Sequence, residues 1–149
     1  MSTIRVEEAV DIRRPVDEVF GYVSDPSNHP QWSGTVVDVQ TDAAGAGGVG
    51  SRFTAHQKFL GRKFEVPYEV TTAERGRRYA YRAVGGPIEP TLTFDVEGLS
   101  PDSTRLTMRV EGDAGTFFGL VGPVLEKAIG RQVRNDLETA KDMLEHEQQ

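Results

Sequence analysis

Residues 12–32 read IRRPVDEVFGYVSDPSNHPQW and contain two consecutive helix signals. Pro15 stands where the first turn of a helix tolerates proline, and the apolar residues of 16–23 follow it at helical spacing. Asp25-Pro26 then has the form of an N-cap followed by a first-turn proline, which predicts a second short helix over 27–32. Two short helices in direct succession are an uncommon arrangement, so this stretch restricts the fold more than any other.

The chain on either side of this stretch shows the alternation typical of strands. Apolar and polar residues alternate from Ile4 to Ile12, which predicts a half-buried strand before the two helices. Further strands are expected near 37–39, 51–60, 64–70, 79–83, 92–96 and 106–110. From about Phe117 the apolar period becomes 3.6 and continues to Leu144, which predicts one long C-terminal helix. We therefore expect an α+β fold in which a curved antiparallel sheet of about seven strands surrounds that helix and encloses an apolar cavity.

Two glycine-containing turns predict the register of two hairpins. A turn at Gly61-Arg62 places Lys58 opposite Glu65, whereas a turn one residue earlier would bring Lys58 opposite Lys63. We expect the first register, with Phe59 opposite Phe64, because it avoids a like-charge pair. A similar turn at Gly85-Gly86 predicts three more pairs: Tyr79 with Leu92, Ala83 with Ile88, and Arg82 with Glu89.

Composition excludes several classes of protein. A length of 149 residues suits one domain, so 1–149 is expected to form a single domain. The 17 basic and 23 acidic residues give a net charge of −6, which argues against a nucleic-acid binder, since phosphate contacts need a concentrated basic surface. Cysteine is absent, and neither a signal-peptide pattern nor a long apolar run occurs, so we expect a cytoplasmic protein that does not insert into membranes.

Two motifs that suggest cofactors do not meet the requirements of such sites. Residues 45–50, GAGGVG, match the dinucleotide-binding pattern, but a strand is predicted after them instead of the helix whose N-terminus would hold a pyrophosphate. We expect a loop near the rim of the cavity there. The three histidines, His29, His56 and His146, lack the spacing of metal ligands. Neither a metal nor a cofactor is therefore expected.

Four stretches of the chain resemble a known family. They are 12–20, 25–32, Val49-Gly50-Ser51-Arg52-Phe53, and Met143-Leu144-Glu145 at the end of the closing helix. Over roughly Ile4 to Glu145 the chain is similar to the START-like helix-grip (SRPBCC) superfamily, and particularly to its polyketide cyclase/dehydrase-like branch. The resemblance implies a cavity between sheet and C-terminal helix that holds lipids, sterols, quinones or polyketides. It carries over no catalytic residue, because the matching stretches are fold motifs.

Strand parity predicts which side chains face this cavity. Tyr68, Tyr79, Tyr81 and Gln57 share the parity of the apolar face, and a few polar groups in an apolar wall are typical of a ligand site. His29 and Trp32, in the second short helix, are expected near the entrance. The predicted ligand-binding residues are Phe53, Ala55, Gln57, Phe59, Val66, Tyr68, Tyr79, Tyr81, Phe94, Met108, Val121, Leu125 and Gln132.

Three functions fit these expectations. The leading hypothesis is a monomer or weak homodimer that binds or carries a small hydrophobic molecule, such as a lipid, quinone or polyketide. The first alternative is a polyketide or aromatic cyclase or dehydratase, in which Tyr68, Tyr81 or Glu8 would move protons. A buried acid–base pair in the cavity would favour that enzyme. The second alternative is a protein-interaction module, which a cavity filled by its own side chains would favour.

Overall fold

The computed structural model describes residues 3–41, 48–113, 117–120 and 122–146. Its elements follow one another in the order β1 (Thr3–Ile12), α1 (Val16–Val23), η1 (Pro26–Asn28), α2 (His29–Trp32), β2 (Val36–Thr41), β3 (Arg52–Phe59), β4 (Arg62–Glu74), β5 (Arg78–Ala83), β6 (Glu89–Ser100), β7 (Ser103–Asp113) and α3 (Gly122–His146). This order confirms the predicted succession of one strand, short helices, six strands and a long helix; η1 and α2 together occupy the place of the second predicted helix.

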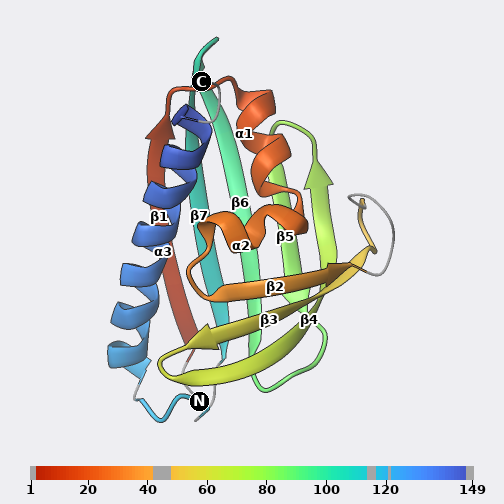
Figure 1. The fold of residues 1–149 in the computed structure, drawn as a ribbon, viewed down its shortest axis with the longest axis vertical. Coiled ribbons are helices and arrows are strands. Elements are labelled where there is room, and N and C mark those ends of the chain that lie inside the picture. The colour runs from red at the N-terminus through yellow and green to blue at the C-terminus, as the bar shows by residue number, and fades with distance from the viewer. Residues whose placement is uncertain (1–2, 42–47, 114–116, 121, 147–149) are drawn as a thin grey trace.

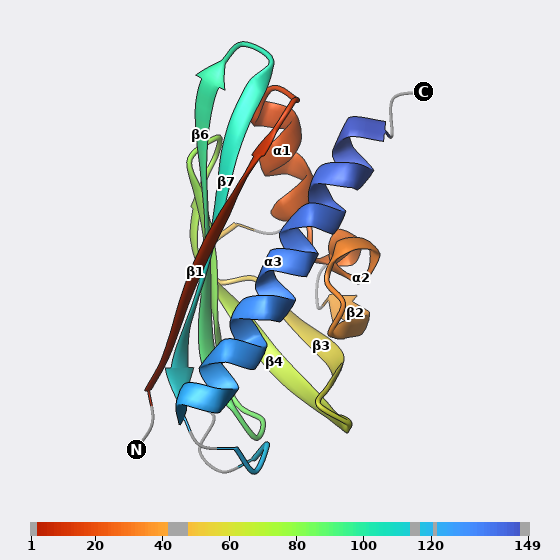
Figure 2. The same cartoon turned by 90° about the vertical axis from the view of Figure 1, so that its left-hand side faces the viewer.

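The seven strands form one antiparallel sheet in the order β1-β7-β6-β5-β4-β3-β2. The sheet curls so strongly that β2 and β3 cross in front of β5 and β6 in Figure 1. Figure 2 shows that α1, α2 and α3 all lie on the same, concave side. The predicted α+β class, with a curved sheet around a long C-terminal helix, is confirmed.

The two helix signals after β1 act as their sequence predicts. The backbone of Pro15 is extended at the N-cap of α1, and the carboxylate of Asp25 accepts a hydrogen bond of 3.0 Å from the backbone N–H of Ser27. Pro26 occupies the first position of η1, where its missing N–H removes no intrahelical bond. The chain therefore turns twice within a few residues and carries α2 onto the concave face of the sheet.

The long helix begins later than its apolar period indicates. Helix α3 starts at Gly122, whereas 117–120 form a turn and a bend, so the predicted start at about Phe117 is wrong. Gly119 adopts a φ of 71°, which an α-helix excludes, and Pro123 occupies the first turn of α3. From there on the helix buries an apolar stripe against the sheet, made of Leu125, Val133, Leu137, Ala140 and Leu144.

The turn between β3 and β4 is one residue earlier than predicted. Leu60 and Gly61 have φ values of 52° and 80°, which is the geometry of a type I′ turn, and Lys58 therefore pairs with Lys63. Both lysines are exposed, so water and salt screen their repulsion. The observed register also places Arg52 opposite Glu69, with an ion pair of 3.3 Å. The shift leaves every side chain of the hairpin on its predicted face.

The hairpin of β5 and β6 also differs from its predicted register. Five residues, 84–88, separate the strands in place of a two-residue turn, so Tyr81 pairs with Leu92 and Tyr79 with Phe94. Gly86 has a φ of 84° and packs so closely on β4 that a Cβ there would lie 2.8 Å from the carbonyl oxygen of Glu65. The loop thus folds over the neighbouring strand, which a tight turn could not do.

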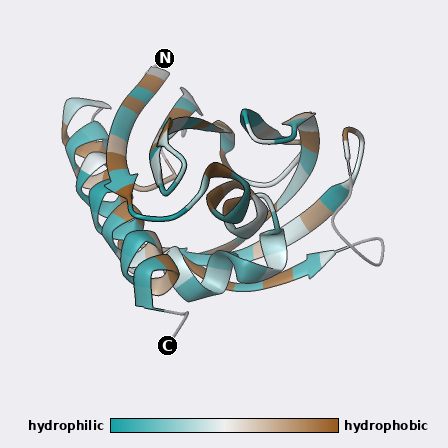
Figure 3. Ribbon diagram, turned by 90° about the horizontal axis from the view of Figure 1, so that it is seen from above, coloured by the Kyte–Doolittle hydropathy of each residue, from teal (hydrophilic) through white to brown (hydrophobic). Residues whose placement is uncertain are grey.

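The core lies between the sheet and the helices. Figure 3 shows the curvature of the sheet from above, with hydrophobic and hydrophilic residues alternating along β1. The largest side chains that are almost wholly buried are Tyr79, Phe94, Ile12 and Leu106 on the strands and Leu137 on α3. These residues fill one part of the concavity, and another part is left partly empty.

Candidate ligand-binding site

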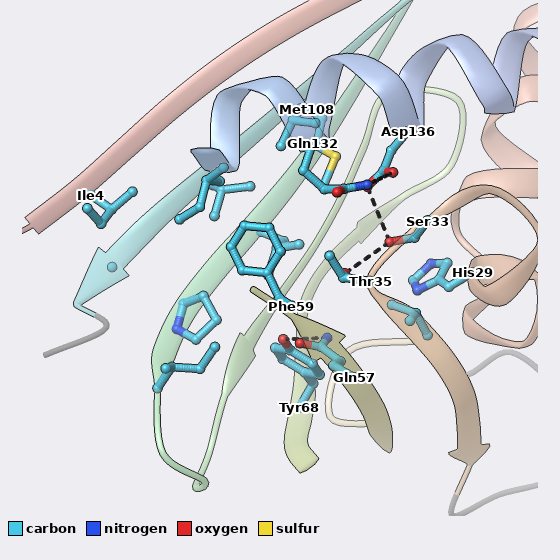
Figure 4. A pocket seen from close by; sticks show the side chains of 18 of the residues that line it. Ile4, His29, Ser33, Thr35, Gln57, Phe59, Tyr68, Met108, Gln132 and Asp136 are labelled. Carbon is cyan, nitrogen blue, oxygen red and sulfur yellow. Dashed lines mark hydrogen bonds between the residues drawn. The ribbon is translucent and has the colours of Figure 1, made fainter. Parts of the chain in front are cut away.

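A cavity of about 120 Å³ lies between the sheet and helices α2 and α3. Its wall combines side chains from all seven strands with α2, the segment after α2, and α3 (Figure 4). Most of the wall is apolar: Ile4, Trp32, Val36, Phe59, Phe64, Ile88, Pro90, Leu92, Met108, Val110, Phe118, Ile129 and Val133. This volume is close to that of an apolar cavity of about 150 Å³ that holds benzene in another protein. The space therefore suits a molecule of about one ring with a short substituent.

Aromatic rings in mutual contact form the inner wall. The ring of Tyr81 lies 4.9 Å from that of Tyr68 and 5.0 Å from that of Phe53, both edge to face. The imidazole of His29 stacks on Tyr81, with 5.8 Å between the ring centres. Because each ring fixes its neighbours, the faces of Tyr81 and Tyr68 are held in place before any ligand enters.

A buried carboxylate is the main polar group of the wall. Asp136 is only 4% exposed, on the face of α3 that is turned toward the sheet. Its Oδ1 accepts hydrogen bonds of 2.8 Å from the Gly34 backbone N–H and 2.8 Å from Gln132 Nε2, and its Oδ2 accepts one of 3.3 Å from the Ser33 hydroxyl (Figure 4). Burial raises the pKa of Asp136 above its ordinary 3.8, and the three donors oppose that rise only in part.

Glycine at position 34 permits this cluster. A Cβ on Gly34 would lie 2.5 Å from Gln132 Nε2 and 3.4 Å from Asp136 Oδ1. A larger residue would push the Gln132 amide away from the carboxylate. The segment between α2 and β2 can therefore approach α3 closely enough to donate its backbone N–H to Asp136.

A second polar pair lies across the cavity on the sheet. Gln57 Nε2 on β3 donates to the Tyr68 hydroxyl on β4 over 3.4 Å. Burial raises the pKa of Tyr68, and the hydrogen bond from Gln57 opposes that rise only in part. Burial likewise raises the pKa of Tyr81 well above 10, together with the negative charges of nearby groups that include Asp136. Both phenols therefore stay protonated at neutral pH.

His29 is a neutral, oriented imidazole in the wall. Its Nε2 lies 3.1 Å from the carbonyl oxygen of Val23, which can only accept, so Nε2 carries the proton and Nδ1 is left as an acceptor. Burial lowers the pKa of His29 to about 4, although the bond to Val23 and the charge of Asp25 act in the opposite direction. At neutral pH the ring therefore presents a lone pair and no positive charge.

Four phenylalanines gather at the lower end of the cavity. The ring centre of Phe118, before α3, lies 5.4 Å from that of Phe59 on β3 and 5.5 Å from that of Phe64 on β4. The ring centre of Phe117 lies 5.2 Å from that of Phe64. Glu111 also lies in this part of the wall and forms an ion pair of 3.1 Å with the exposed Arg5. The segment before α3 thus packs against the β3–β4 hairpin and closes this end.

Residues 3–145 match the family described as polyketide cyclase/dehydrase and lipid transport. The chain belongs to this family. An uncharacterized protein of Mycobacterium tuberculosis, Rv0088, is 29% identical over 106 residues, which cover 69% of this chain and 45% of that protein. The match therefore spans less than half of the relative's own length.

Two solved structures show how closely the fold is shared. A START superfamily protein from Mycobacterium smegmatis superposes with a TM-score of 0.82 at 17% identity, over 95% of this chain and 97% of the other. The Zhui aromatase/cyclase from Streptomyces sp. R1128 superposes with a TM-score of 0.79 at 18% identity, over 99% of this chain and 96% of the other. The predicted resemblance to the START-like superfamily and its polyketide cyclase-like branch is confirmed, and at these identities the structural likeness concerns the fold.

The predicted ligand-binding residues of this family member fall into three groups. Those that line the cavity are Gln57, Phe59, Tyr68, Tyr81, Met108 and Gln132. Those buried in the core beside it are Phe53, Ala55, Val66, Tyr79, Phe94 and Leu125. Val121 lies outside the described residues, as do 45–47 of the glycine-rich stretch. Parity thus identified inward-facing residues, but not which of them border empty space.

Three other predictions change with the structure. His29 and Trp32 are each about 2% exposed, so both belong to the buried wall and not to an exposed rim. Glu8 points to α3, where it forms an ion pair of 3.0 Å with Arg134, so it is not a proton-transferring group of the cavity. The reason is that β1 lies beside α3, which covers the inner face of this strand.

Sequence reasoning did not select Ser33 or Asp136 as site residues. Asp136 occupies a position of the apolar period of the last helix, three residues after Val133 and four before Ala140. A carboxylate on the buried stripe of a helix was the signal that could have identified it, because such a group needs donors or a ligand. Ser33 carries no comparable signal, since serine commonly follows a short helix.

Two further findings concern metals and membranes. Among the described residues, no group of three or more His, Asp or Glu side chains is arranged to hold a metal ion. In the same part of the chain, no helix is both long enough and apolar enough to cross a membrane.

Proposed function

We propose that the protein binds a small, largely apolar molecule in the cavity between the sheet and α3. The observation that carries this proposal is a preformed space of about 120 Å³, walled by apolar and aromatic side chains, into which a few polar groups converge. Burial of apolar surface supplies most of the affinity, at roughly 25 cal/mol per Å². The family, whose description includes lipid transport, and the fold shared with the Zhui aromatase/cyclase support a ligand of this kind.

The size of the cavity restricts the ligand. A long acyl chain or a fused-ring polyketide needs several times this volume, since drug-sized ligands occupy pockets of roughly 300–1,000 Å³. A molecule of about one ring fits without movement of the wall. The unfilled space also counts against a module that serves only to dock other proteins, because such a module has no use for an internal cavity.

Native mass spectrometry of the purified protein, followed by denaturing extraction, tests this function. We expect a co-purifying small molecule that Val110→Trp abolishes, because Val110 lines the cavity and an indole would occupy the space. Val124→Trp is the matched control, since Val124 is 51% exposed on α3. Loss of the molecule in both variants, or no bound mass together with no thermal stabilisation by a panel of hydrophobic compounds, would contradict the proposal.

A cyclase or dehydratase is the second candidate, and one observation favours it. The cavity wall contains both a buried carboxylate, Asp136, and a buried imidazole, His29. Burial moves the pKa of Asp136 toward neutrality, where a general acid or base works best, but it moves that of His29 away to about 4. Ring closure or water loss of an offered poly-β-ketone, abolished by Asp136→Asn, would support the enzyme, and unchanged turnover in that variant would exclude this role for Asp136.

A further inference from the structure

The charged side chains that line the cavity are all acidic. Among the described residues of its wall there is no lysine or arginine, whereas Asp136, Glu111 and Asp113 are acidic. Glu111 is neutralised by Arg5 at the lower end. Asp136, in contrast, is held by three uncharged donors, so its charge is not balanced by any of them. A ligand with a carboxylate or phosphate would therefore meet repulsion inside this cavity.

The unused hydrogen-bonding capacity of the wall includes several acceptors. Gln132 donates one of its two amide N–H groups to Asp136, and Gln57 donates one to the Tyr68 hydroxyl, so the carbonyl oxygen of each is left as an acceptor. His29 presents Nδ1 as an acceptor, because Nε2 is bound to Val23. Oδ2 of Asp136 receives a single, long bond of 3.3 Å and keeps room for another donor. The wall also has a buried donor without a partner, Trp32 Nε1, so it offers acceptors for the N–H groups of a ligand as well as one indole N–H.

The aromatic wall favours a cation for a separate reason. The rings of Tyr81 and Tyr68 line the same cavity as the Asp136 carboxylate. A cation over the face of such a ring is attracted by the ring's quadrupole, more strongly when water is excluded. A carboxylate beside aromatic faces is an arrangement that holds an ammonium group.

We propose that the ligand is a small primary amine of about one ring, whose ammonium group pairs with Oδ2 of Asp136 and whose apolar body packs against Tyr81, Tyr68 and Phe59. This inference rests on the proposed function, because it names the class of molecule that the same cavity binds. The ammonium brings three N–H donors to the acceptors of the wall and a positive charge to an unbalanced negative one. The net charge of −6 on the whole chain attracts cations to the protein before they reach the site.

In the ligand-free protein the carboxylate of this ion pair is already desolvated, so part of the desolvation penalty does not arise on binding. A buried pair is often no better than an apolar contact, since both charges lose their hydration. Here the carboxylate is desolvated before the ligand arrives, as the raised pKa of Asp136 indicates. Only the ammonium has to lose water on binding, so the attraction between the two charges is retained in the affinity.

Isothermal titration calorimetry with three matched compounds at pH 7 tests the proposal. The compounds are 2-phenylethylamine, 2-phenylethanol and phenylacetate, which share a phenyl ring and differ in charge. We expect the amine to bind roughly ten- to hundredfold more tightly than the alcohol, as a charge-assisted hydrogen bond implies, and phenylacetate to bind most weakly. In Asp136→Asn the amine should lose this advantage while the alcohol keeps its affinity. Glu138→Gln removes a charge from an exposed position of the same helix and should leave the preference intact.

The outcomes separate this proposal from the one on which it rests. If the alcohol binds the wild-type protein as tightly as the amine, or if Asp136→Asn keeps the full preference, the amine proposal is overturned and the cavity remains a site for apolar molecules. If none of the three compounds binds and no molecule co-purifies, both proposals fail. The wild-type series decides the amine preference by itself, so a variant that does not fold leaves the test valid.

Discussion

The side chain of Asp136 holds two segments of the chain together and also lines the cavity. Its carboxylate ties α3 to the segment after α2 through Gly34 and Ser33, yet it is buried in a wall of low polarity. The hydrogen bonds stabilise the charged form and burial destabilises it, and the second effect is the larger. Buried groups that cost stability at neutral pH are typical of binding and catalytic sites.

Asp136→Asn should raise the thermal stability of the protein at pH 7 and have little effect near pH 4. The asparagine oxygen can still accept from Gly34, and its amide can donate to Ser33. Because the folded-state pKa of Asp136 lies above the ordinary 3.8, the native state binds more protons than the unfolded one in the window above 3.8, and stability falls as pH rises through it. An asparagine at this position does not titrate, so the variant does not lose stability in this way as the pH rises. Circular dichroism melting curves at pH 4 to 8 measure it, and a variant that gains no stability relative to wild type between pH 4 and pH 7 contradicts the assignment.

His29 should make the protein sensitive to mild acid. Its pKa falls from 6.5 in the unfolded chain to about 4 in the native state, so the unfolded chain binds more protons in this window and stability is lost as pH falls through it. The shift corresponds to a loss of about 3 kcal/mol of unfolding free energy as the pH falls through this window. His29→Gln keeps a donor for Val23 without the titration, so its stability should fall less between pH 6.5 and pH 4 than that of wild type. Urea unfolding at a series of pH values measures the difference, and parallel pH profiles would show that His29 does not titrate as buried.

Among the helices and strands, features set by neighbouring residues could be predicted from the sequence, whereas features set by long-range packing could not. The two short helices were predictable, because Pro15, Asp25 and Pro26 act on their own neighbours. The β3–β4 register was not, because it requires Leu60 to adopt a φ of 52°, a conformation that its side chain disfavours. The pairing along the whole hairpin outweighs that local cost. The sequence of the turn alone does not indicate this longer-range pairing.

Leu60→Asn should stabilise the β3–β4 hairpin by about 0.5–1 kcal/mol. A type I′ turn requires positive φ at both central residues, and Asn-Gly is the sequence that favours it most. Leu60 is 46% exposed, so little burial is lost. Chemical denaturation measures the change, with Val84→Asn as a control in an exposed loop position. No gain, or a loss, would indicate that the turn does not have the I′ geometry.

The C-terminal turn of α3 is anchored by one carboxylate. The side chain of Glu145 is only 5% exposed and accepts hydrogen bonds of 2.8 Å from the Arg13 backbone N–H and 2.8 Å from Lys141 Nζ. Burial by itself raises the pKa of Glu145, but these donors outweigh it and lower the pKa below the ordinary 4.5. The helix is thereby fixed to the end of β1 and the start of α1.

Glu145→Ala should cost about 1–3 kcal/mol of unfolding free energy, because it removes the charge-assisted hydrogen bonds to the Arg13 backbone N–H and to Lys141. Glu138→Ala, on the exposed face of the same helix, should change it by less than about 0.5 kcal/mol. Equilibrium unfolding in urea compares the two variants. Equal effects would mean that the network around Glu145 contributes nothing beyond helix propensity.

For the whole molecule, the fold was predictable further than the site. Alternation along the strands and the 3.6 period of α3 indicate which faces turn inward, and those faces are as expected. The position of the cavity depends on how far each inward side chain fills the concavity, which pattern does not encode. Tyr79 and Phe94 face inward yet complete the core, whereas Ser33 and Asp136 reach the empty space because Gly34 lets two segments meet, 102 residues apart in the chain.

The empty space couples ligand binding to the stability of the entire fold, and Val133→Ile should reveal that coupling. Val133 lies on α3 and lines the cavity, and one added methylene there fills part of it without a polar atom. We expect the free protein to gain about 0.8 kcal/mol, or roughly 2–4 °C in melting temperature. Ligand, in turn, stabilises the wild type in proportion to the logarithm of its concentration over its Kd, and should stabilise the variant less because it binds more weakly. Melting curves over a ligand titration measure both effects, with Val124→Ile on the exposed face of α3 as control. A variant that is more stable and still gains as much from ligand as wild type does would place the ligand outside this cavity, since the same volume cannot be filled twice.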